Sequence, residues 1–161
     1  MIYLLLPAYN EEEAIGKLIE SVINLKKSSG LSLSVLVVDD GSNDDTSEVS
    51  EKSKASVLSH IVNLGKGAAL KTGCDYAVKR GAKYIITLDA DAQHNPENIP
   101  RFIEKLDKYD IVFSYRKASR KMPSVLRFGN WFISNVVEFL YGVSLKDTQC
   151  GFRAFSKYAY K

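Results

Sequence analysis

The sequence has little of what marks several large classes of protein. It holds only two cysteines, Cys74 and Cys150, among 161 residues, too few for a disulfide framework. We therefore expect both thiols to be free, in a reducing compartment. No apolar run reaches the roughly 18–20 residues that a membrane-spanning helix needs. The nearest candidate, Trp131 to Leu145, is interrupted by Asn135 and Glu138, so no transmembrane helix is predicted.

Several nucleotide-binding and targeting signals are also missing. No G-x-G-x-x-G motif occurs, which argues against a dinucleotide-dependent dehydrogenase. The segment Asn63–Gly67 is rich in glycine but lacks the spacing and the Lys-Ser/Thr ending of a P-loop. The apolar start Met1–Pro7 has neither a basic leader nor a small-residue cleavage site. We interpret it as a first strand rather than a signal peptide.

The composition that remains is that of an ordinary globular domain with an uneven charge. Hydrophobic residues make up 45% and charged residues 25%, and a chain of this length can bury a core without cross-links. Residues 1–100 carry 10 basic and 14 acidic side chains, whereas residues 101–161 carry 12 and 5. Five basic residues and no acid lie between Arg116 and Arg127. This cluster indicates contact with phosphate or an anionic membrane surface, or else a solvated loop. Alone it is weak support for nucleic-acid binding, which we do not expect.

Short apolar runs alternate with segments of helical periodicity along the first two thirds of the chain. Strands are predicted at 2–6, 35–38, 57–62, 84–88 and 110–115. Helices are predicted at 11–27, 44–54, 67–79 and 96–108. This order predicts an α/β fold with a mostly parallel sheet covered by helices on both faces. A further helix is expected around Ser124–Tyr141, and another begins at Ser156–Lys161. Because the chain stops there, we expect one domain over 1–161 that is truncated at its C-terminal end.

Polar side chains follow the predicted strands, at the sheet edge where ligands of open α/β folds bind. Asp39 and Asp40 place two carboxylates at a buried strand end, which is costly by repulsion and desolvation. They could accept hydrogen bonds from a nucleotide base or ribose, or form a polar turn that caps the next helix. The glycines and amides of Asn63–Gly67 at a helix start favour an anion, with a plain tight turn as the alternative.

Two further segments carry candidate chemistry. Asp89 and Asp91, at i and i+2 after the fourth strand, offer the oxygen ligands that suit Mg²⁺ or Mn²⁺. Such an ion could neutralise a diphosphate leaving group, although D-x-D pairs also occur in surface turns. His94 nearby is interpreted as a bystander. Asp147–Arg153 combines an acid, a glycine and an arginine. It would place Asp147 near an acceptor, or form a turn into an edge strand.

Taken together, five segments resemble the family 2 glycosyltransferases, in particular the polyprenyl- and dolichyl-phosphate sugar synthases. The resemblance covers essentially the whole chain, and Ala8 and Gln149-Cys150 depart from the usual pattern on the acceptor side. The segments are Pro7–Glu11, Asp39–Ser42, Asn63–Gly67, Asp89–Gln93 and Asp147–Arg153.

The resemblance implies a GT-A fold and an inverting transfer of a hexose from a UDP- or GDP-sugar, with Mg²⁺ or Mn²⁺ as cofactor. The metal would meet Asp89, Asp91 and Gln93. Catalysis would involve Asp91, Arg116, Asp147 and Arg153. The nucleotide sugar would be held by Pro7, Tyr9, Glu11, Asp39, Asp40, Lys66, Asp89 and Lys117.

The expected acceptor is a polyprenyl or dolichyl phosphate, which is already an anion and needs cationic positioning more than a general base. We therefore expect a peripheral protein on the cytoplasmic face of a membrane. The apolar helix expected around Ser124–Tyr141 could rest at the interface, or serve core packing or a contact between two copies. The alternatives are a saccharide hydroxyl acceptor, a non-catalytic nucleotide-sugar-binding module, and a nucleotidyltransferase.

Overall fold

The computed structural model describes residues 1–91, 94–115 and 150–160. The chain divides into two compact units, one made of Met1–Val112 with Phe152–Lys161 and the other of Phe113–Gly151. The first unit holds the core and the pocket described below. In the second unit, the Ser114 hydroxyl and the Cys150 thiol lie 2.8 Å apart in a hydrogen bond. Cys74 and Cys150 are both buried, and neither forms a disulfide within the described residues.

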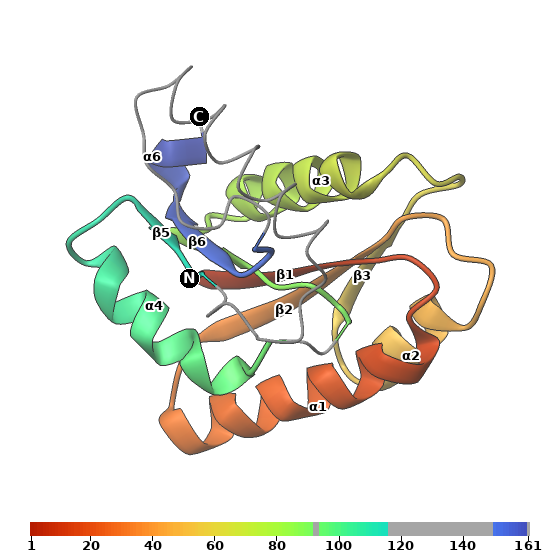
Figure 1. The fold of residues 1–161 in the computed structure, drawn as a ribbon, viewed down its shortest axis with the longest axis horizontal. Helices are drawn as coiled ribbons and strands as arrows, with labels where there is room; N and C mark the ends of the chain where they lie inside the picture. Colours follow the sequence, from red (N-terminus) through yellow and green to blue (C-terminus); the bar gives the residue numbers. More distant parts are fainter. Residues whose placement is uncertain (92–93, 116–149, 161) are drawn as a thin grey trace, which may run out of the picture. The chain divides into compact units, whose positions relative to one another are not determined.

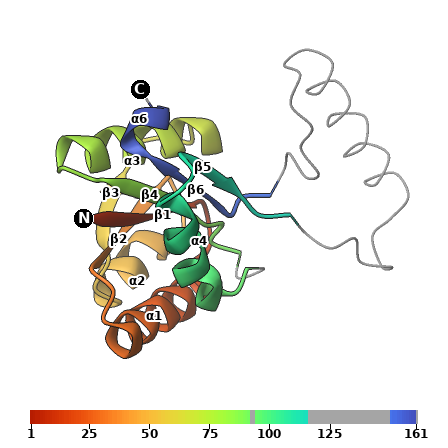
Figure 2. The same ribbon diagram turned by 90° about the vertical axis from the view of Figure 1, so that its left-hand side faces the viewer.

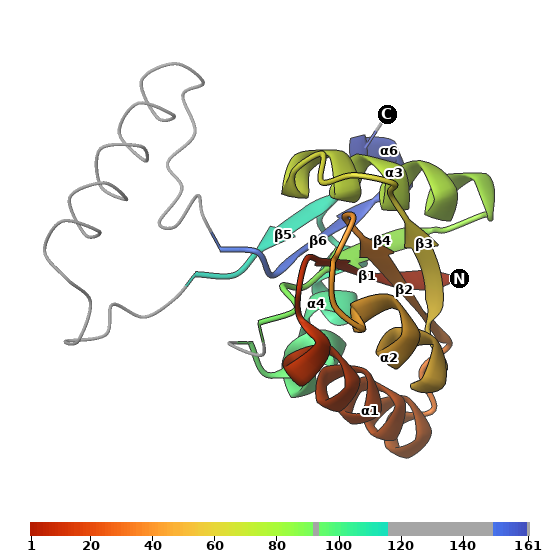
Figure 3. The same ribbon diagram turned by 90° about the vertical axis from the view of Figure 1, so that its right-hand side faces the viewer.

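A six-stranded sheet runs in the order β3-β2-β1-β4-β6-β5 (Figures 1 and 3). Its central strands are parallel: β1 pairs with β2 on one side and with β4 on the other, and β2 pairs with β3. The strands are β1 (Ile2–Ala8), β2 (Leu33–Asp39), β3 (Ser56–Ser59), β4 (Tyr84–Thr87), β5 (Ile111–Phe113) and β6 (Arg153–Ser156). The mostly parallel sheet predicted from the sequence is confirmed.

The strand β6 is inserted between β4 and β5 and runs antiparallel to β4, with Thr87 opposite Arg153. The Asp147–Arg153 segment therefore does not lead into an edge strand, which was one of the two interpretations of its sequence. Ala154 and Ser156 are buried in this position. The insertion brings residues from the C-terminal end of the chain beside the strand that precedes Asp89.

Helices cover both faces of the sheet, as predicted (Figures 1 and 2). One face carries α1, α2 and α4, and the other carries α3 and the short α6. The helices are α1 (Glu12–Ser29), α2 (Thr46–Lys52), α3 (Lys66–Lys79), α4 (Ile99–Leu106) and α6 (Lys157–Tyr160), with a 3₁₀ turn η1 (Pro96–Asn98) before α4. Within the described residues, no helix combines the length and apolar character needed to cross a membrane.

The core consists of two apolar layers on either side of β1 and its neighbours. Tyr3 and Leu5 pack with residues of α3, and because strand side chains alternate, Leu4 and Leu6 point to the opposite face. Gly73 lets α3 approach the sheet, since a Cβ there would lie 2.2 Å from a Leu5 methyl carbon. This close packing fixes the position of α3, whose first turn borders the pocket.

Three predicted boundaries are corrected. Pro7 does not end the first strand, because Ala8 still pairs with Asp39. The third strand ends at Ser59 rather than residue 62, because the His60 side chain turns toward the loop after β2 and Ile61 is fully exposed. The helix predicted at 96–108 is a 3₁₀ turn followed by α4, which ends at Leu106.

Candidate functional site

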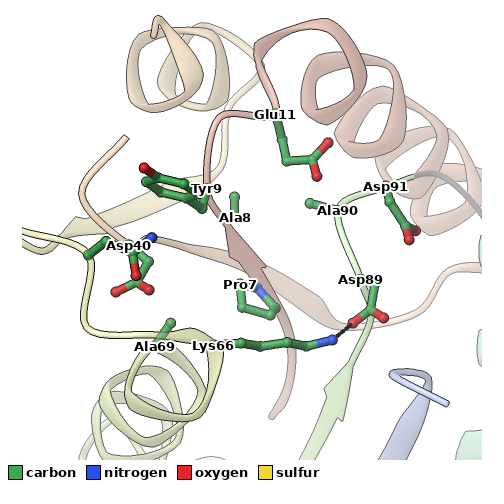
Figure 4. Close-up of a pocket in the computed structure, with 11 residues that line it drawn as sticks. Pro7, Ala8, Tyr9, Glu11, Asp40, Lys66, Ala69, Asp89, Ala90 and Asp91 are labelled. Carbon is green, nitrogen blue, oxygen red and sulfur yellow. Dashed lines mark hydrogen bonds and ion pairs between the residues drawn. The ribbon is translucent and has the colours of Figure 1, made fainter. Parts of the chain in front are cut away.

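A pocket of about 320 Å³ lies at the carboxyl edge of the sheet. The loops after β1, β2 and β4 and the first turn of α3 surround it (Figure 4). Its size is within the range of small-ligand sites, and this edge is where ligands of open α/β folds bind. Its lining residues are Pro7, Ala8, Tyr9, Glu11, Asp40, Asn63, Lys66, Ala69, Asp89, Ala90 and Asp91.

The loops after β1 and β2 are joined by reciprocal hydrogen bonds. The Asn10 amide donates to the Ser42 hydroxyl at 2.9 Å, and the Asn43 amide donates to the Asn10 side-chain oxygen at 2.9 Å. Asn10 has a left-handed φ of 54°, which asparagine tolerates better than most residues. This bracing holds Tyr9, which is half-exposed, and Glu11 at the rim of the pocket.

The Asp39 carboxylate accepts hydrogen bonds from within its own turn. One of its oxygens accepts from both the backbone amide and the hydroxyl of Ser42. Asp39 is buried and is not among the pocket residues. Gly41 closes this turn with a φ of 73°, and a Cβ there would lie 2.5 Å from the Val62 carbonyl carbon. The interpretation of this segment as a polar turn is confirmed, whereas the predicted contact of Asp39 with a nucleotide stays a prediction.

Asp40 is buried and accepts three hydrogen bonds, although it also borders the pocket. The donors are His60 Nδ1 at 2.7 Å, the Leu64 amide at 3.0 Å and the Gly65 amide at 2.7 Å. Burial acts to raise its pKa, but the hydrogen bonds from His60 and the two amides together hold the pKa below the ordinary aspartate value. Asp40 is therefore held in its ionised form by hydrogen bonds from the fold itself.

His60 extends this arrangement to α3. Because an ionised carboxylate only accepts hydrogen bonds, His60 Nδ1 carries the proton donated to Asp40. Its Nε2 lies 2.9 Å from the Thr72 hydroxyl. Sequence reasoning did not find His60, and a lone histidine at the end of a strand gave no signal for this contact.

The loop after β3 was expected to bind an anion through its amides. The anion that the Leu64 and Gly65 amides bind is the Asp40 carboxylate. What the loop presents to the pocket is the Lys66 side chain, whose Nζ lies 2.6 Å from an Asp89 oxygen (Figure 4). Asn63 and Ala69 also line the pocket. Asn63 was visible in the sequence segment, whereas the small side chain of Ala69 gave no signal.

Acidic side chains gather around the rest of the pocket. Asp89 and Asp91 follow β4, and Glu11 approaches from the loop after β1 (Figure 4). Burial, followed by the negative charges of Asp91 and Asp44, raises the pKa of the Glu11 carboxyl. The repulsion between Glu11 and Asp91 shows that negative charge gathers here, which favours the arrival of a cation.

The residues present fit a divalent cation bound together with a diphosphate. No three His, Cys, Asp or Glu side chains gather into a chelating cluster in residues 1–91, 94–115 and 150–160. Mg²⁺ and Mn²⁺ need fewer protein ligands at such sites, because one or two carboxylates act together with substrate phosphates and waters. Asp89 and Asp91 supply such a pair. The third predicted ligand, Gln93, lies outside the described residues.

The remaining predicted site residues are placed only in part. Arg153 begins β6 opposite Thr87, two residues before Asp89, and is not among the pocket residues. Arg116, Lys117 and Asp147 lie outside the described residues. His94 packs edge-on against Phe152, and its interpretation as a bystander stays a prediction.

Comparison with known proteins adds family information to this geometry. A family model described as glycosyl transferase family 2 matches residues 3–160. The chain is 39% identical to an uncharacterized protein of Methanocaldococcus jannaschii, with 99% of this chain and 66% of that protein covered. It is 35% identical to the UDP-N-acetylglucosamine–dolichyl-phosphate N-acetylglucosaminyltransferase of Methanococcus voltae, with 100% and 71% covered.

A more distant relative is the undecaprenyl-phosphate 4-deoxy-4-formamido-L-arabinose transferase of Salmonella typhimurium, at 31% identity with 97% and 49% covered. Among solved structures, glucosyl-3-phosphoglycerate synthase from Mycobacterium tuberculosis, in complex with Mn²⁺ and UDP-glucose, aligns with a TM-score of 0.75 at 25% identity. That alignment covers 98% of this chain and 56% of the other. This chain spans from 49% to 71% of the length of the three relatives named here.

Proposed function

The chain belongs to glycosyl transferase family 2 and has the GT-A fold, and from this premise we propose that its pocket binds a nucleotide sugar. The sugar is transferred, with inversion, to a polyprenyl or dolichyl phosphate. The donor is a UDP-sugar in the first instance, because the Methanococcus voltae relative is named for UDP-N-acetylglucosamine and the Mn²⁺ complex contains UDP-glucose. A GDP-sugar is the second choice for the donor.

The observation that carries this proposal is the arrangement of charge at the carboxyl edge of the sheet. Glu11, Asp89 and Asp91 border one pocket together with the Lys66 ammonium group. Paired carboxylates can hold a divalent cation, and a lysine can bind phosphate as a point charge. A diphosphate with its cation matches both kinds of charge, whereas a neutral sugar alone matches neither.

The protein residues divide the work on the donor. Pro7 near the end of β1, and Tyr9 and Glu11 on the loop that follows, hold the nucleotide, and Asp89 and Asp91 hold Mg²⁺ or Mn²⁺. When bound, the cation neutralises the charge that develops on the diphosphate leaving group. Asp39 and Asp40 shape the nucleotide side of the pocket through the loops that they brace.

The acceptor assignment rests on the relatives and on charge. Two relatives at 31% or more identity are named for dolichyl-phosphate or undecaprenyl-phosphate acceptors. A lipid phosphate is anionic at neutral pH and attacks without a general base. It needs cationic positioning, which we assign to Arg116, Lys117 and Arg153, with Asp147 near the acceptor. The enzyme then works at the cytoplasmic face of a membrane as a peripheral protein.

The first test is calorimetric titration of the purified protein with UDP-N-acetylglucosamine, UDP-glucose and GDP-mannose, each with and without Mn²⁺. We expect Mn²⁺-dependent binding of one donor, and loss of that binding in Asp91→Asn. Asp75→Asn is the matched control, because Asp75 is also a partly exposed carboxylate but lies on α3 away from the pocket. Binding that is equally strong without Mn²⁺ would contradict the metal assignment.

The acceptor is tested separately, by transfer from the donor that binds. We expect labelled sugar to appear on dolichyl phosphate in detergent and not on a saccharide. Transfer to a saccharide hydroxyl would identify the alternative acceptor class. Donor binding without transfer, in the full-length protein, would identify a non-catalytic binding module.

A further inference from the structure

One contact in the pocket joins two residues that the proposed function assigns to different ligands. The Lys66 Nζ lies 2.6 Å from Asp89 Oδ1, while Asp89 is expected to bind a divalent cation (Figure 4). An ammonium group on Asp89 Oδ1 opposes the binding of a divalent cation to the same carboxylate, because the two cations repel each other at this distance. Either the lysine lowers the affinity for the cation, or it moves when the cation binds.

The structure fixes the backbone of Lys66 and leaves its side chain the freer part. The preceding Gly65 amide donates to Asp40, and the Gly65 carbonyl accepts from the Ala68 and Ala69 amides. These bonds anchor the first turn of α3. The Lys66 side chain is 53% exposed, whereas the Asp89 side chain is 21% exposed. A long, flexible stem on an anchored helix start can redirect its charge without moving the pocket wall.

Resting on the proposed function, we propose that Lys66 is a displaceable counter-ion for Asp89. In the empty pocket the ammonium group neutralises the carboxylate. A divalent cation that binds Asp89 and Asp91 releases it, and the released ammonium group turns to the diphosphate of the donor. Lys66 therefore opposes binding of the cation alone and supports binding of the cation together with the donor.

This exchange has a physical basis in the charges already present. Glu11, Asp89 and Asp91 place three carboxylates around the pocket, and the Lys66 ammonium group pairs with Asp89. An incoming divalent cation reverses the local sign, so the ammonium group is repelled from Asp89. The diphosphate restores negative charge on the same side of the pocket, where a lysine binds phosphate as a point charge.

The test is to remove the charge of Lys66 and to measure two ligands separately. Mn²⁺ alone is titrated into wild-type protein and Lys66→Met, with free Mn²⁺ followed by electron paramagnetic resonance. UDP is then titrated calorimetrically at saturating Mn²⁺. We expect Lys66→Met to bind Mn²⁺ alone about threefold to fivefold more tightly, which is the upper part of the range for loss of an exposed ion pair. We expect it to bind UDP about fivefold or more weakly, since a charge-assisted phosphate contact is lost.

Two further variants serve as controls. Lys71→Met removes an ion pair of the same length, 2.6 Å, from the same helix but outside the pocket, and neither affinity should change. Lys66→Arg keeps the positive charge and should bind Mn²⁺ within about twofold of wild type. Circular dichroism of each variant checks that the fold is retained.

Opposite shifts of the two affinities support the inference, because a merely structural role for Lys66 would weaken both. Unchanged or weaker Mn²⁺ binding in Lys66→Met overturns it, even if wild-type protein binds UDP and transfers sugar as proposed. Absence of Mn²⁺ binding in both proteins also overturns it, since no cation then competes for Asp89. If UDP does not bind wild-type protein at saturating Mn²⁺, GDP is titrated in the same way, and failure of both overturns the proposed function and, with it, the donor half of the exchange.

Discussion

Two acidic pairs follow buried strands of the same sheet, and the fold treats them in opposite ways. Asp39 and Asp40, at the end of β2, are buried and receive hydrogen bonds from Ser42, His60 and two backbone amides. Asp89 and Asp91, after β4, border the pocket, where the Lys66 ammonium group contacts Asp89.

The difference lies in the donors that surround each pair. Backbone amides and a partly buried histidine have fixed positions, so they satisfy Asp40 permanently and make it part of the scaffold. A half-exposed lysine can be exchanged for a ligand. Whether a carboxylate at the end of a strand is part of the scaffold or a binding group therefore depends on its hydrogen-bond donors. Fixed donors make it structural, and an exchangeable side chain leaves it open to a ligand.

The largest expected effect is at the pocket pair. Asp91→Asn should lower Mn²⁺-dependent transfer by about 100-fold or more, because a carboxylate ligand contributes to several kcal/mol of charge stabilisation. The melting temperature should change by less than about 2 °C, as for most surface substitutions. Transfer assays and calorimetric melting check both statements. Activity within twofold of wild type would remove Asp91 from the metal site.

At the scaffold pair the expected effect is on stability. Asp40→Asn should lower the free energy of unfolding by about 2–3 kcal/mol, because an amide cannot accept all three bonds as a carboxylate does. The pKa of Asp40 is lowered in the folded protein. Its ionised form therefore stabilises the fold above the ordinary aspartate pKa, and this stabilisation is lost as the pH falls through the lowered value.

Urea unfolding at neutral and acidic pH measures this contribution. The gap between wild type and Asp40→Asn should be widest at neutral pH and should narrow in acid. A gap that grows in acid would show that Asp40 is not held as an anion by its hydrogen bonds.

A smaller effect is expected one contact further from Asp40. Thr72→Val removes the hydroxyl beside His60 Nε2 and should lower the free energy of unfolding by about 1 kcal/mol. The same substitution should weaken the binding of UDP with Mn²⁺ by no more than about twofold to threefold, because Asp40 still holds the loop before Lys66. Urea unfolding and calorimetry measure the two effects, and a larger loss of binding than of stability would place Thr72 in the site.

The smallest expected effect is a gain in stability at Glu11. Its pKa is raised by burial and by the charges of Asp91 and Asp44, so its charged form opposes folding at neutral pH. Glu11→Gln should raise the melting temperature at pH 7 by about 1–2 °C. The gain should disappear below the ordinary glutamate pKa of 4.5, where wild-type Glu11 is also neutral. Calorimetric scans at the two pH values test this sign.

Much of the fold follows from local patterns. The apolar run 35–38 predicted β2, because a strand buried on both faces of a sheet is apolar throughout. The helical spacing of apolar residues after Glu11 predicted α1, because a helix buries one stripe of its surface. The third strand was overextended, since Ile61 and Val62 are apolar but exposed. An exposed valine or isoleucine has the same sequence signal as a buried one.

For the site, the sequence by itself determined which loops would meet. Parallel strands place their carboxyl ends at one edge, so Glu11, Asp40, Lys66, Asp89 and Asp91 were expected together, and all of them line one pocket. Only the tertiary structure decided how they pair. His60 reaches Asp40 across 20 positions, and Lys66 reaches Asp89 across 23. Such contacts depend on the directions of side chains, which packing sets. Hydrogen bonds and ion pairs act over only a few ångströms, whereas the sequence pattern records only which face of a helix or strand a residue occupies.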